Sequence, residues 1–282
     1  SEMCIRDRYE MMTNQPSKSY ENIEFLNSSD ARSIRVLCEL IEPHSKLKQK
    51  KVTSTIVFFG SARSKEKKIA IQDLAELEKK MRAENRSKPQ LEHELQKAKR
   101  LVKLSEYYDK ALSLSRKLSA WGSVSNPEKH HICSGGGPGM MEAANRGAHE
   151  MRCNSIAYGI SLPFEQGINE FASEELSFEF HYFFIRKFYF LYHAKAVGIF
   201  PGGFGTMDEL FETLTLIQTK KLNKRMPIYL FGKEFWDGLI NFDHFIEWEV
   251  ISVQDIDLFR IVNDVEEAYE LIIDDLTNEV RS

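Results

Sequence analysis

The distribution of hydrophobic residues along the chain predicts short buried strands that alternate with helices. Short runs of β-branched and aromatic residues are typical of strands inside a parallel sheet, and apolar positions three or four apart indicate helices. The predicted strands are Val52–Phe59, His130–Ser134, Ser155–Leu162, Leu176–Tyr182, a run from Ala196, Pro227–Phe231 and Phe259–Val262. The predicted helices after them include Phe184–Ala194, Thr206–Leu222, Phe235–Phe245 and Val265–Leu276. This alternation predicts a Rossmann-like three-layer α/β/α fold around a mostly parallel sheet.

Two regions depart from the alternation. About residues 64–120 show helical periodicity without a strand, and Pro89 stands where a second helix would start, which predicts an inserted helical hairpin. Residues 1–51 predict an N-terminal extension with one helix, which Pro43 would end. Its first eight residues read as foreign to the fold, and the main domain is expected over residues 52–282.

Glycines follow several of the predicted strands. Gly60-Ser61 closes the first strand, Gly135–Gly139 follows the strand at His130, and Pro201–Thr206 follows the strand at Ala196. Because ligands in such sheets bind beyond the carboxyl ends of the strands, these loops are expected to meet at one rim. Unpaired N–H groups and the dipole at the start of a helix favour an anion there.

Charged side chains accompany this predicted anion site. Glu209 stands three residues after Thr206, so both side chains can lie on one helix face. Arg186 can donate two hydrogen bonds to a phosphate, and Lys187 would act as a point charge. The combination suggests catalysis on a phosphorylated substrate.

Composition excludes several other classes. The chain has 42% hydrophobic and 28% charged residues and a net charge of −4, which gives no reason to expect a nucleic acid or membrane partner. The four cysteines show no C-x-x-C spacing, so neither a metal site nor a disulfide framework is indicated, and a cytoplasmic location is expected. No P-loop, dinucleotide, zinc-protease or nucleophile-elbow motif occurs.

Three motifs, in this order along the chain, resemble those of the LOG family. Gly135–Asn145 resembles the glycine loop and following helix of its bacterial members. The pair Arg186-Lys187 falls where the family has an R-K pair, and Pro201–Glu209 resembles its P-G-G-x-G-T-x-x-E signature. The resemblance covers about residues 55–276 and leaves out the extension and much of the insertion.

The resemblance implies a Rossmann-like phosphoribohydrolase that splits a nucleoside 5′-monophosphate into free base and ribose 5-phosphate. The base is a cytokinin in some members, while others cleave AMP or related nucleotides. A homodimer or higher homo-oligomer is implied. Members were long labelled lysine decarboxylases, but decarboxylation needs an electron sink such as pyridoxal phosphate, and no Schiff-base lysine is marked. We expect no cofactor and no metal.

The resemblance also implies roles for particular residues. Glu209 and Arg186 are the expected catalytic residues: Glu209 stabilises a ribosyl cation, orients the ribose or activates water, while Arg186 fixes the substrate or assists the leaving base. The base would lie toward the glycine loop, against Met140 or Glu142. The expected substrate-binding and phosphate-binding residues are Gly202, Gly203, Gly205, Thr206, Gly136, Gly137, Gly139, Met140, Lys187, Gly60 and Ser61.

Two other interpretations remain open. The same scaffold could form a carrier or sensor that binds a nucleotide or a molybdenum cofactor without cleaving it, as the molybdenum-cofactor carrier proteins resemble. The carboxylate of Glu209 beside a phosphate argues for the enzyme, because like charges repel and a binder has no need of it. The helical insertion could instead make the chain a scaffold for partners.

Overall fold

The computed structural model describes residues 16–83, 89–124, 130–162, 167–222 and 224–279. The expectation for the first eight residues lies outside these ranges. The chain divides into two compact units, with the division between Ser45 and Lys46. The larger unit contains the sheet and the candidate site.

The chain before the sheet contains the 3₁₀ helix η1 (Ser19–Glu21) and helices α2 (Ile23–Asn27) and α3 (Arg32–Gln49). The prediction that Pro43 ends the helix is wrong, because α3 continues through it to Gln49. A proline inside a helix removes one backbone hydrogen bond without removing those of the next turn. Leu47, in that next turn, is fully buried, and its burial favours the continued helix.

The described residues form one seven-stranded sheet in which every neighbouring pair is parallel. The strand order is β4-β3-β2-β1-β5-β6-β7, so β4 and β7 are the edge strands. The strands are β1 (Ser54–Phe59), β2 (His130–Ser134), β3 (Ser155–Ile160), β4 (Ser177–Phe180), β5 (Ala194–Ile199), β6 (Ile228–Phe231) and β7 (Phe259–Val262). The Rossmann-like α/β fold predicted from the alternation is therefore confirmed.

The order of the strands locates the ligand-binding edge. From β1 the chain moves through β2 and β3 toward one side of the sheet, whereas from β5 it moves through β6 and β7 toward the other. β1 and β5 are neighbours, and the crevice at such a reversal is where doubly wound sheets bind ligands. The loops after β1 and β5 are those that contain Gly60 and Gly202.

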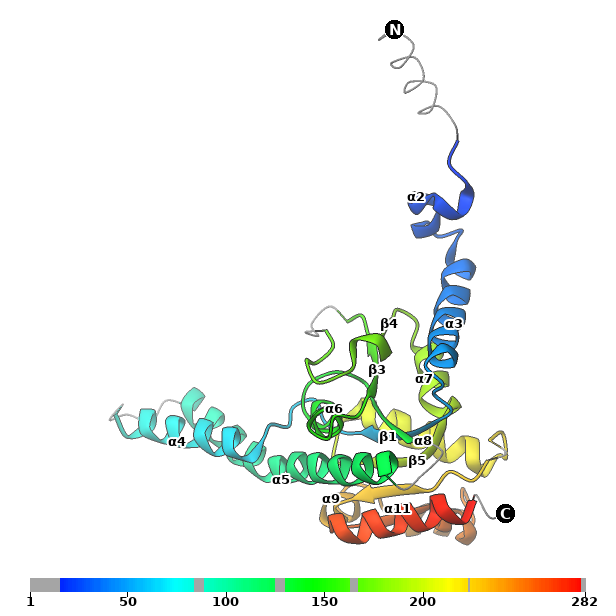
Figure 1. Ribbon diagram of the computed structural model, residues 1–282. Helices are drawn as coiled ribbons and strands as arrows, with labels where there is room; N and C mark the ends of the chain where they lie inside the picture. Colours follow the sequence, from blue (N-terminus) through cyan, green and yellow to red (C-terminus); the bar gives the residue numbers. More distant parts are fainter. Residues whose placement is uncertain (1–15, 84–88, 125–129, 163–166, 223, 280–282) are drawn as a thin grey trace. The chain divides into compact units, whose positions relative to one another are not determined.

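Helices lie on both faces of the sheet (Figure 1). The helices after β1 are α4 (Lys67–Ala83), α5 (Pro89–Val124), α6 (Met140–Glu150), α7 (Phe183–Tyr192), α8 (Phe204–Gln218), α9 (Lys233–Asp237), α10 (Phe242–Glu247) and α11 (Val265–Glu279), with 3₁₀ helices η2 (Glu174–Leu176) and η3 (Val253–Leu258). Of these, α4 and the first part of α5 extend away from the sheet (Figure 1). The inserted hairpin is α4 and α5, and α5 begins at Pro89 as predicted. The single helix expected over Phe235–Phe245 is instead α9 and α10, because Asn241 caps a new helix by accepting a hydrogen bond from the His244 N–H.

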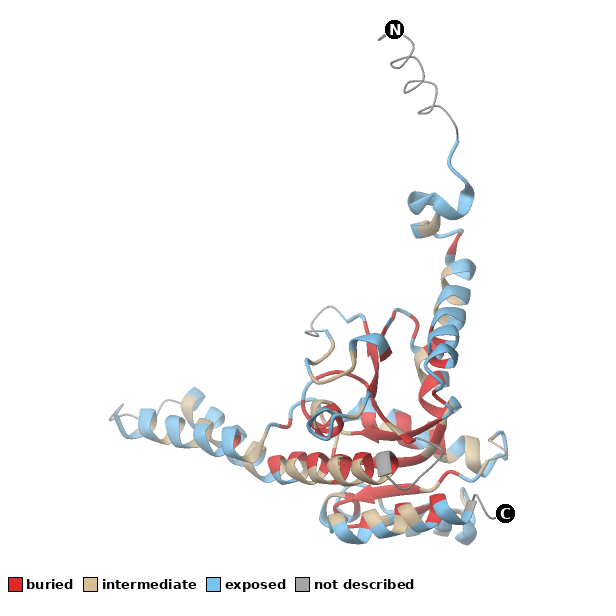
Figure 2. Cartoon of the chain, in the orientation of Figure 1, coloured by how far each residue is buried: buried red, intermediate tan, exposed pale blue. Residues whose placement is uncertain are grey.

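The core fills the space between sheet and helices. One large cluster joins β1, β2, β5, β6 and β7 to helices α5, α6 and α11. On the other face α7 packs through aromatic rings, with Phe190 against Phe59 and Tyr158. Buried residues follow the strands and the inner sides of the helices (Figure 2). No helix in the described part of the chain combines the length and apolar character needed to span a bilayer.

Candidate functional site

The three predicted glycine loops meet through backbone hydrogen bonds. The Ser61 N–H donates to the Pro201 carbonyl at 3.1 Å, and the Ser61 carbonyl accepts from the Met140 N–H at 3.1 Å. Ser61 therefore lies between the loop after β5 and the start of α6. The structure brings together segments that are far apart in the sequence, at the carboxyl ends of β1, β2 and β5.

Two glycines are required by this close approach. Gly139 has φ +73°, and a Cβ there would collide with the Ser61 carbonyl and with the backbone of Ala62. Gly136 has φ +72°, and its Cβ would lie 2.9 Å from the Ala157 side chain. The glycines of this loop thus let β2 turn sharply into α6 while the loop after β1 passes directly over it.

Helix α8 begins two residues earlier than predicted, at Phe204, with Gly203 as its N-cap residue. Its first turn therefore contains Gly205 and Thr206, and the N–H groups of a first turn have no partner within their own helix. Nothing lies within 4 Å of the position that a Cβ would take on Gly203 or Gly205. A ligand can therefore approach the backbone closely at both positions.

Glu209 lies in the second turn of α8, and its side chain is directed into the protein. The residue is only 6% exposed, and its Oε2 has no hydrogen-bond partner among the described residues. Burial raises the pKa of Glu209 to about 7, although the positive charges of Lys187 and Arg186 act to lower it. A carboxyl group with this pKa can exchange protons near neutral pH.

Arg186, on α7, lies beside the glycine loop, and its positive charge acts on Glu209. Its Nε donates to the Tyr158 carbonyl at 2.6 Å, and its guanidinium lies 4.9 Å from the centre of the Phe190 ring. Its Nη2 lies 2.6 Å from the position of a Cβ on Gly135. These contacts fix the guanidinium beside the loop after β2, on the same side of the sheet as α7.

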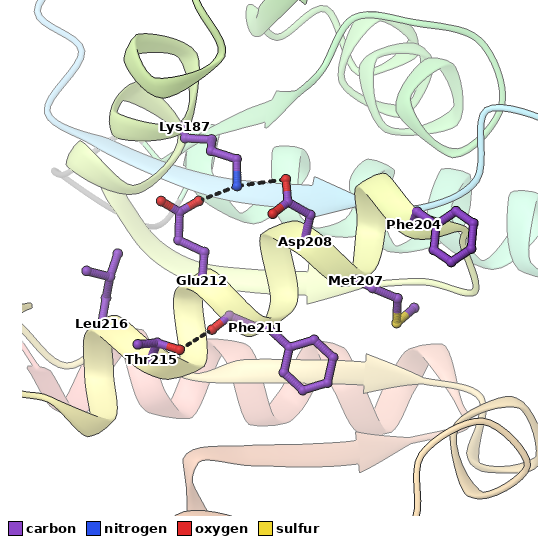
Figure 3. A pocket seen from close by; sticks show the side chains of 8 residues that line it. All are labelled: Lys187, Phe204, Met207, Asp208, Phe211, Glu212, Thr215 and Leu216. Atoms are coloured by element: carbon purple, nitrogen blue, oxygen red, sulfur yellow. Dashed lines mark hydrogen bonds and ion pairs between the residues drawn. The ribbon is translucent and has the colours of Figure 1, made fainter.

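Lys187 has a different environment from the one expected. Its Nζ lies 2.8 Å from carboxylate oxygens of both Asp208 and Glu212 on α8 (Figure 3). Burial acts to lower the pKa of Lys187, but hydrogen bonds to these two carboxylates outweigh it, and the pKa is raised. Lys187 therefore joins α7 to α8 and affects Glu209 through its charge, while the structure does not direct it toward the first turn of α8.

A groove of about 660 Å³ runs along α8, and its lining includes the ion-paired Lys187, Asp208 and Glu212 as well as Phe204, Met207 and Phe211 (Figure 3). Neither Thr206 nor Glu209 lines it. Thr206 and Glu209 are buried instead, so we place the candidate site at the carboxyl ends of β1 and β5 and not in this groove.

The structure does not bring the side chain of Met140 into the crevice. Met140 is fully buried, and its Cγ lies 2.6 Å from the position of a Cβ on Gly60. Glu142 accepts a hydrogen bond from the Tyr108 hydroxyl on α5 at 2.7 Å. Met140 contributes to the site through its backbone bond to Ser61, and Glu142 contacts the inserted hairpin.

Sequence reasoning missed a set of polar residues beneath the glycine loop. Asn169, in the connection from β3 to β4, donates through Nδ2 to the carbonyls of Gly136 at 2.9 Å and Gly137 at 3.2 Å. It also donates to Oδ1 of Asn145, a residue with no exposed surface. Asn145 was visible in the motif at the start of α6, but Asn169 stands in a polar stretch that carries no periodic pattern.

Comparison with known proteins bears on these residues. A family model described as "Possible lysine decarboxylase" matches residues 141–272, which include Arg186 and Glu209. No curated protein matches the chain significantly. Within the described residues, no group of three or more His, Cys, Asp or Glu side chains could hold a metal ion.

Solved structures similar to the chain include the structural-genomics target TM1055, with 20% identity and a TM-score of 0.46 over 78% of this chain and 99% of that one. A molybdenum cofactor binding protein from the phototrophic bacterium Rippkaea orientalis has 19% identity and a TM-score of 0.40 over 58% and 87% of the two chains. A Moco carrier protein from Chlamydomonas reinhardtii has 18% identity and a TM-score of 0.39 over 60% and 90%. The family model covers a little under half of the chain, and the Arg186-Lys187 pair and the Pro201–Glu209 motif both lie within residues 141–272.

Proposed function

We propose that this protein hydrolyses the N-glycosidic bond of a nucleoside 5′-monophosphate, AMP or a related cytokinin nucleotide, to the free base and ribose 5-phosphate. The observation that supports this most directly is Glu209: its carboxyl group is buried, Oε2 is unpartnered among the described residues, and its pKa is about 7. It lies one turn beyond the helix start where a phosphate would bind. Burying a carboxyl group without a partner costs free energy, which is typical of a functional site.

The reaction needs a negative charge at a defined place. Cleavage of the bond between base and ribose passes through a ribosyl cation, and water then adds to the anomeric carbon. An ionised Glu209 would stabilise this cation or accept the proton of the attacking water. The hydroxyl group of the water stays on the anomeric carbon, and the proton of the water goes to the departing base. The reaction therefore balances without a cofactor.

The other groups would each bind a different part of the substrate. The first turn of α8, with Gly203, Gly205 and Thr206, would bind the 5′-phosphate through its N–H groups and the Thr206 hydroxyl. Arg186 lies beside the glycine loop, where its guanidinium would contact the ribose or the base. In this proposal the glycosidic bond would lie between the two loops and beside Glu209.

The test is the release of base from a panel of purine, pyrimidine and cytokinin monophosphates, measured by chromatography together with ribose 5-phosphate. The Glu209→Gln variant keeps the size of the side chain and removes its charge, so base release should fall about a hundredfold or more while nucleotide binding remains. Glu270→Gln, an exposed change of the same kind on α11, is the control and should retain the wild-type rate.

Two outcomes would contradict the proposal. Undiminished release of base in Glu209→Gln would remove this residue from the mechanism. Binding of the monophosphates without cleavage of any of them by the wild type would instead favour the carrier or sensor interpretation. Calorimetric titration with each nucleotide separates these outcomes, because it measures affinity whether or not cleavage follows.

A further inference from the structure

A buried network of polar side chains holds the Gly135–Gly139 loop from below. Asn145 Oδ1 accepts from Ser134 Oγ at 2.7 Å and from Asn169 Nδ2 at 3.0 Å. Asn145 Nδ2 donates to Ser155 Oγ at 3.0 Å and to the Ile156 carbonyl at 3.3 Å. Both polar atoms of the Asn145 amide are thus paired, as a buried amide requires.

Asn169 connects this network to the backbone of the loop. Its own N–H donates to the Gly136 carbonyl at 2.7 Å, and its Nδ2 donates to the carbonyls of Gly136 and Gly137. Only the NH₂ end of an amide can face carbonyl oxygens in this way, which fixes the orientation of the side chain. Its Oδ1 accepts from the Phe171 N–H at 3.2 Å and so ties Asn169 to its own segment.

These hydrogen bonds determine the direction in which the backbone N–H groups of the loop point. A trans peptide is planar, with its carbonyl and N–H on opposite sides. Because the Gly136 carbonyl is held toward Asn169, the Gly137 N–H of the same peptide points away from Asn169. The Gly136 N–H itself donates to Ser134 Oγ at 3.1 Å, and Pro138 has no N–H. Gly136 has a positive φ, which a glycine adopts without strain, so the direction of its peptide groups is set by these hydrogen bonds.

We propose that Asn169 is a positioning residue for the candidate site: it holds the Gly135–Gly139 loop in the shape that meets the base and ribose of the nucleotide. Asn169, in the connection from β3 to β4, would then affect substrate binding through the glycine loop, without itself contacting the substrate. This inference rests on the proposed function for the identity of the ligand. Its structural part, the support of the loop by Asn169, is independent of that function.

The sharpest variant is Asn169→Asp, which has nearly the same shape. It replaces the donating NH₂ by an oxygen, so an ionised carboxylate would face the carbonyls of Gly136 and Gly137 and the amide oxygen of Asn145. Asn169→Ala removes the donors without adding charge and serves if the first variant does not fold. Asn241→Asp is the matched control, because an aspartate caps α10 as well as an asparagine does.

Two measurements test the proposal. Hydrogen–deuterium exchange of peptides that cover residues 134–140 should become at least about tenfold faster in Asn169→Asp and Asn169→Ala, and remain unchanged in Asn241→Asp. Calorimetry with AMP should show an affinity at least about tenfold weaker in both Asn169 variants. If AMP is cleaved, KM should rise more than kcat falls. The ratio of the Asn169→Asp kcat/KM to the wild-type value should recover as the pH is lowered, because a protonated carboxyl can donate to one carbonyl.

The outcomes separate this inference from the proposed function. Unchanged exchange at residues 134–140 overturns the support of the loop by Asn169. Faster exchange with unchanged AMP affinity overturns its role for the site. If the wild type binds AMP without cleaving it, the hydrolase proposal fails. The AMP affinities of the Asn169 variants and the wild type still decide whether Asn169 positions the loop for the ligand. If the wild type does not bind AMP, the nucleotide assignment fails, the positioning role toward AMP falls with it, and exchange alone decides whether Asn169 supports the loop.

Discussion

The Thr206 side chain occupies the space that a Cβ on Gly202 would need. Its hydroxyl oxygen is the nearest atom to that position, and its Cβ follows at 2.6 Å. The first glycine of the Pro201–Glu209 motif is therefore required by the threonine of the same motif, which turns inward and is only 6% exposed. The other two glycines, Gly203 and Gly205, have open space at the same position.

This difference predicts opposite effects of two alanine substitutions. Gly202→Ala should destabilise the protein by about 1–3 kcal/mol, because the methyl group overpacks against Thr206. Gly205→Ala should stabilise α8 by about 1 kcal/mol, since alanine favours a helix over glycine and nothing obstructs its methyl group. The same methyl group would lie where a phosphate approaches the backbone, so nucleotide affinity should fall about tenfold.

Chemical denaturation measures both stabilities, and calorimetry with AMP measures the affinity. Equal losses of stability in the two variants would contradict the geometry at Thr206. A Gly205→Ala variant with the wild-type affinity would show that the phosphate does not approach this turn of α8.

The buried Glu209 predicts that stability depends on pH. Its pKa is raised from 4.5 to about 7, so the folded protein binds a proton more readily than the unfolded chain between these values. This stabilising contribution is fully present below about pH 4.5, and it is lost as the pH rises to about 7. The loss is on the order of 3 kcal/mol.

Glu209→Gln, which cannot ionise, should therefore be more stable than the wild type at pH 8 by up to about 3 kcal/mol. The difference should shrink as the pH approaches 5. Denaturant unfolding of both proteins at several pH values measures it. A constant difference across this range would mean that the carboxyl group titrates normally.

The rate of catalysis should also depend on pH through the ionisation of Glu209. If the charged form of Glu209 acts on the ribosyl cation, kcat/KM for AMP should rise about tenfold per pH unit below about pH 7 and level off above it. A rate that falls with rising pH in this range would assign Glu209 to proton donation instead.

Lys187 provides a separate test of this pH dependence. Its charge lowers the pKa of Glu209, although it is paired with Asp208 and Glu212. Lys187→Gln should therefore move the rise of kcat/KM to a higher pH while leaving the plateau rate similar. Lys233→Gln, which removes an exposed ion pair with Asp237 on α9, is the control and should leave the profile in place.

We expect the protein to form a homodimer or a higher homo-oligomer through the outer sides of α7 and α8. Phe184 is 60% exposed and Phe188 is 44% exposed, and both line a groove of about 650 Å³ with Leu216. Exposed apolar surface of this kind marks interaction sites. Phe188→Asp should shift the protein to a smaller species in sedimentation velocity, while Leu239→Asp, an equally polar change at another exposed position, should not.

The sequence predicted the parts of this structure that depend on local pattern. Strand β2 and the start of α5 at Pro89 were placed correctly, because a short strand that runs into glycines and a proline at a helix start are local signals. Pro43 was misjudged because the burial of Leu47, a tertiary effect, outweighs one lost hydrogen bond.

The candidate site was only partly predictable for the same reason. Strand ends and glycines indicated that three loops meet at one edge of the sheet, and the backbone bonds of Ser61 join them. The ion pairs of Lys187 and the bonds of Asn169 depend on which side chains the fold brings together across the sheet. Nor could the sequence give the raised pKa of Glu209, which comes from burial.

The pairing of β1 with β5 has a consequence for how the protein acquires its site. Ile56 lies beside Ala196, roughly 140 positions later in the chain. Contacts between such distant residues slow folding, since a long loop must close before they form. During synthesis, the first strand therefore remains without its β5 neighbour until most of the chain has been made. The crevice between them should be among the last parts of the protein to form, and fragments that end before β5 should have no nucleotide site.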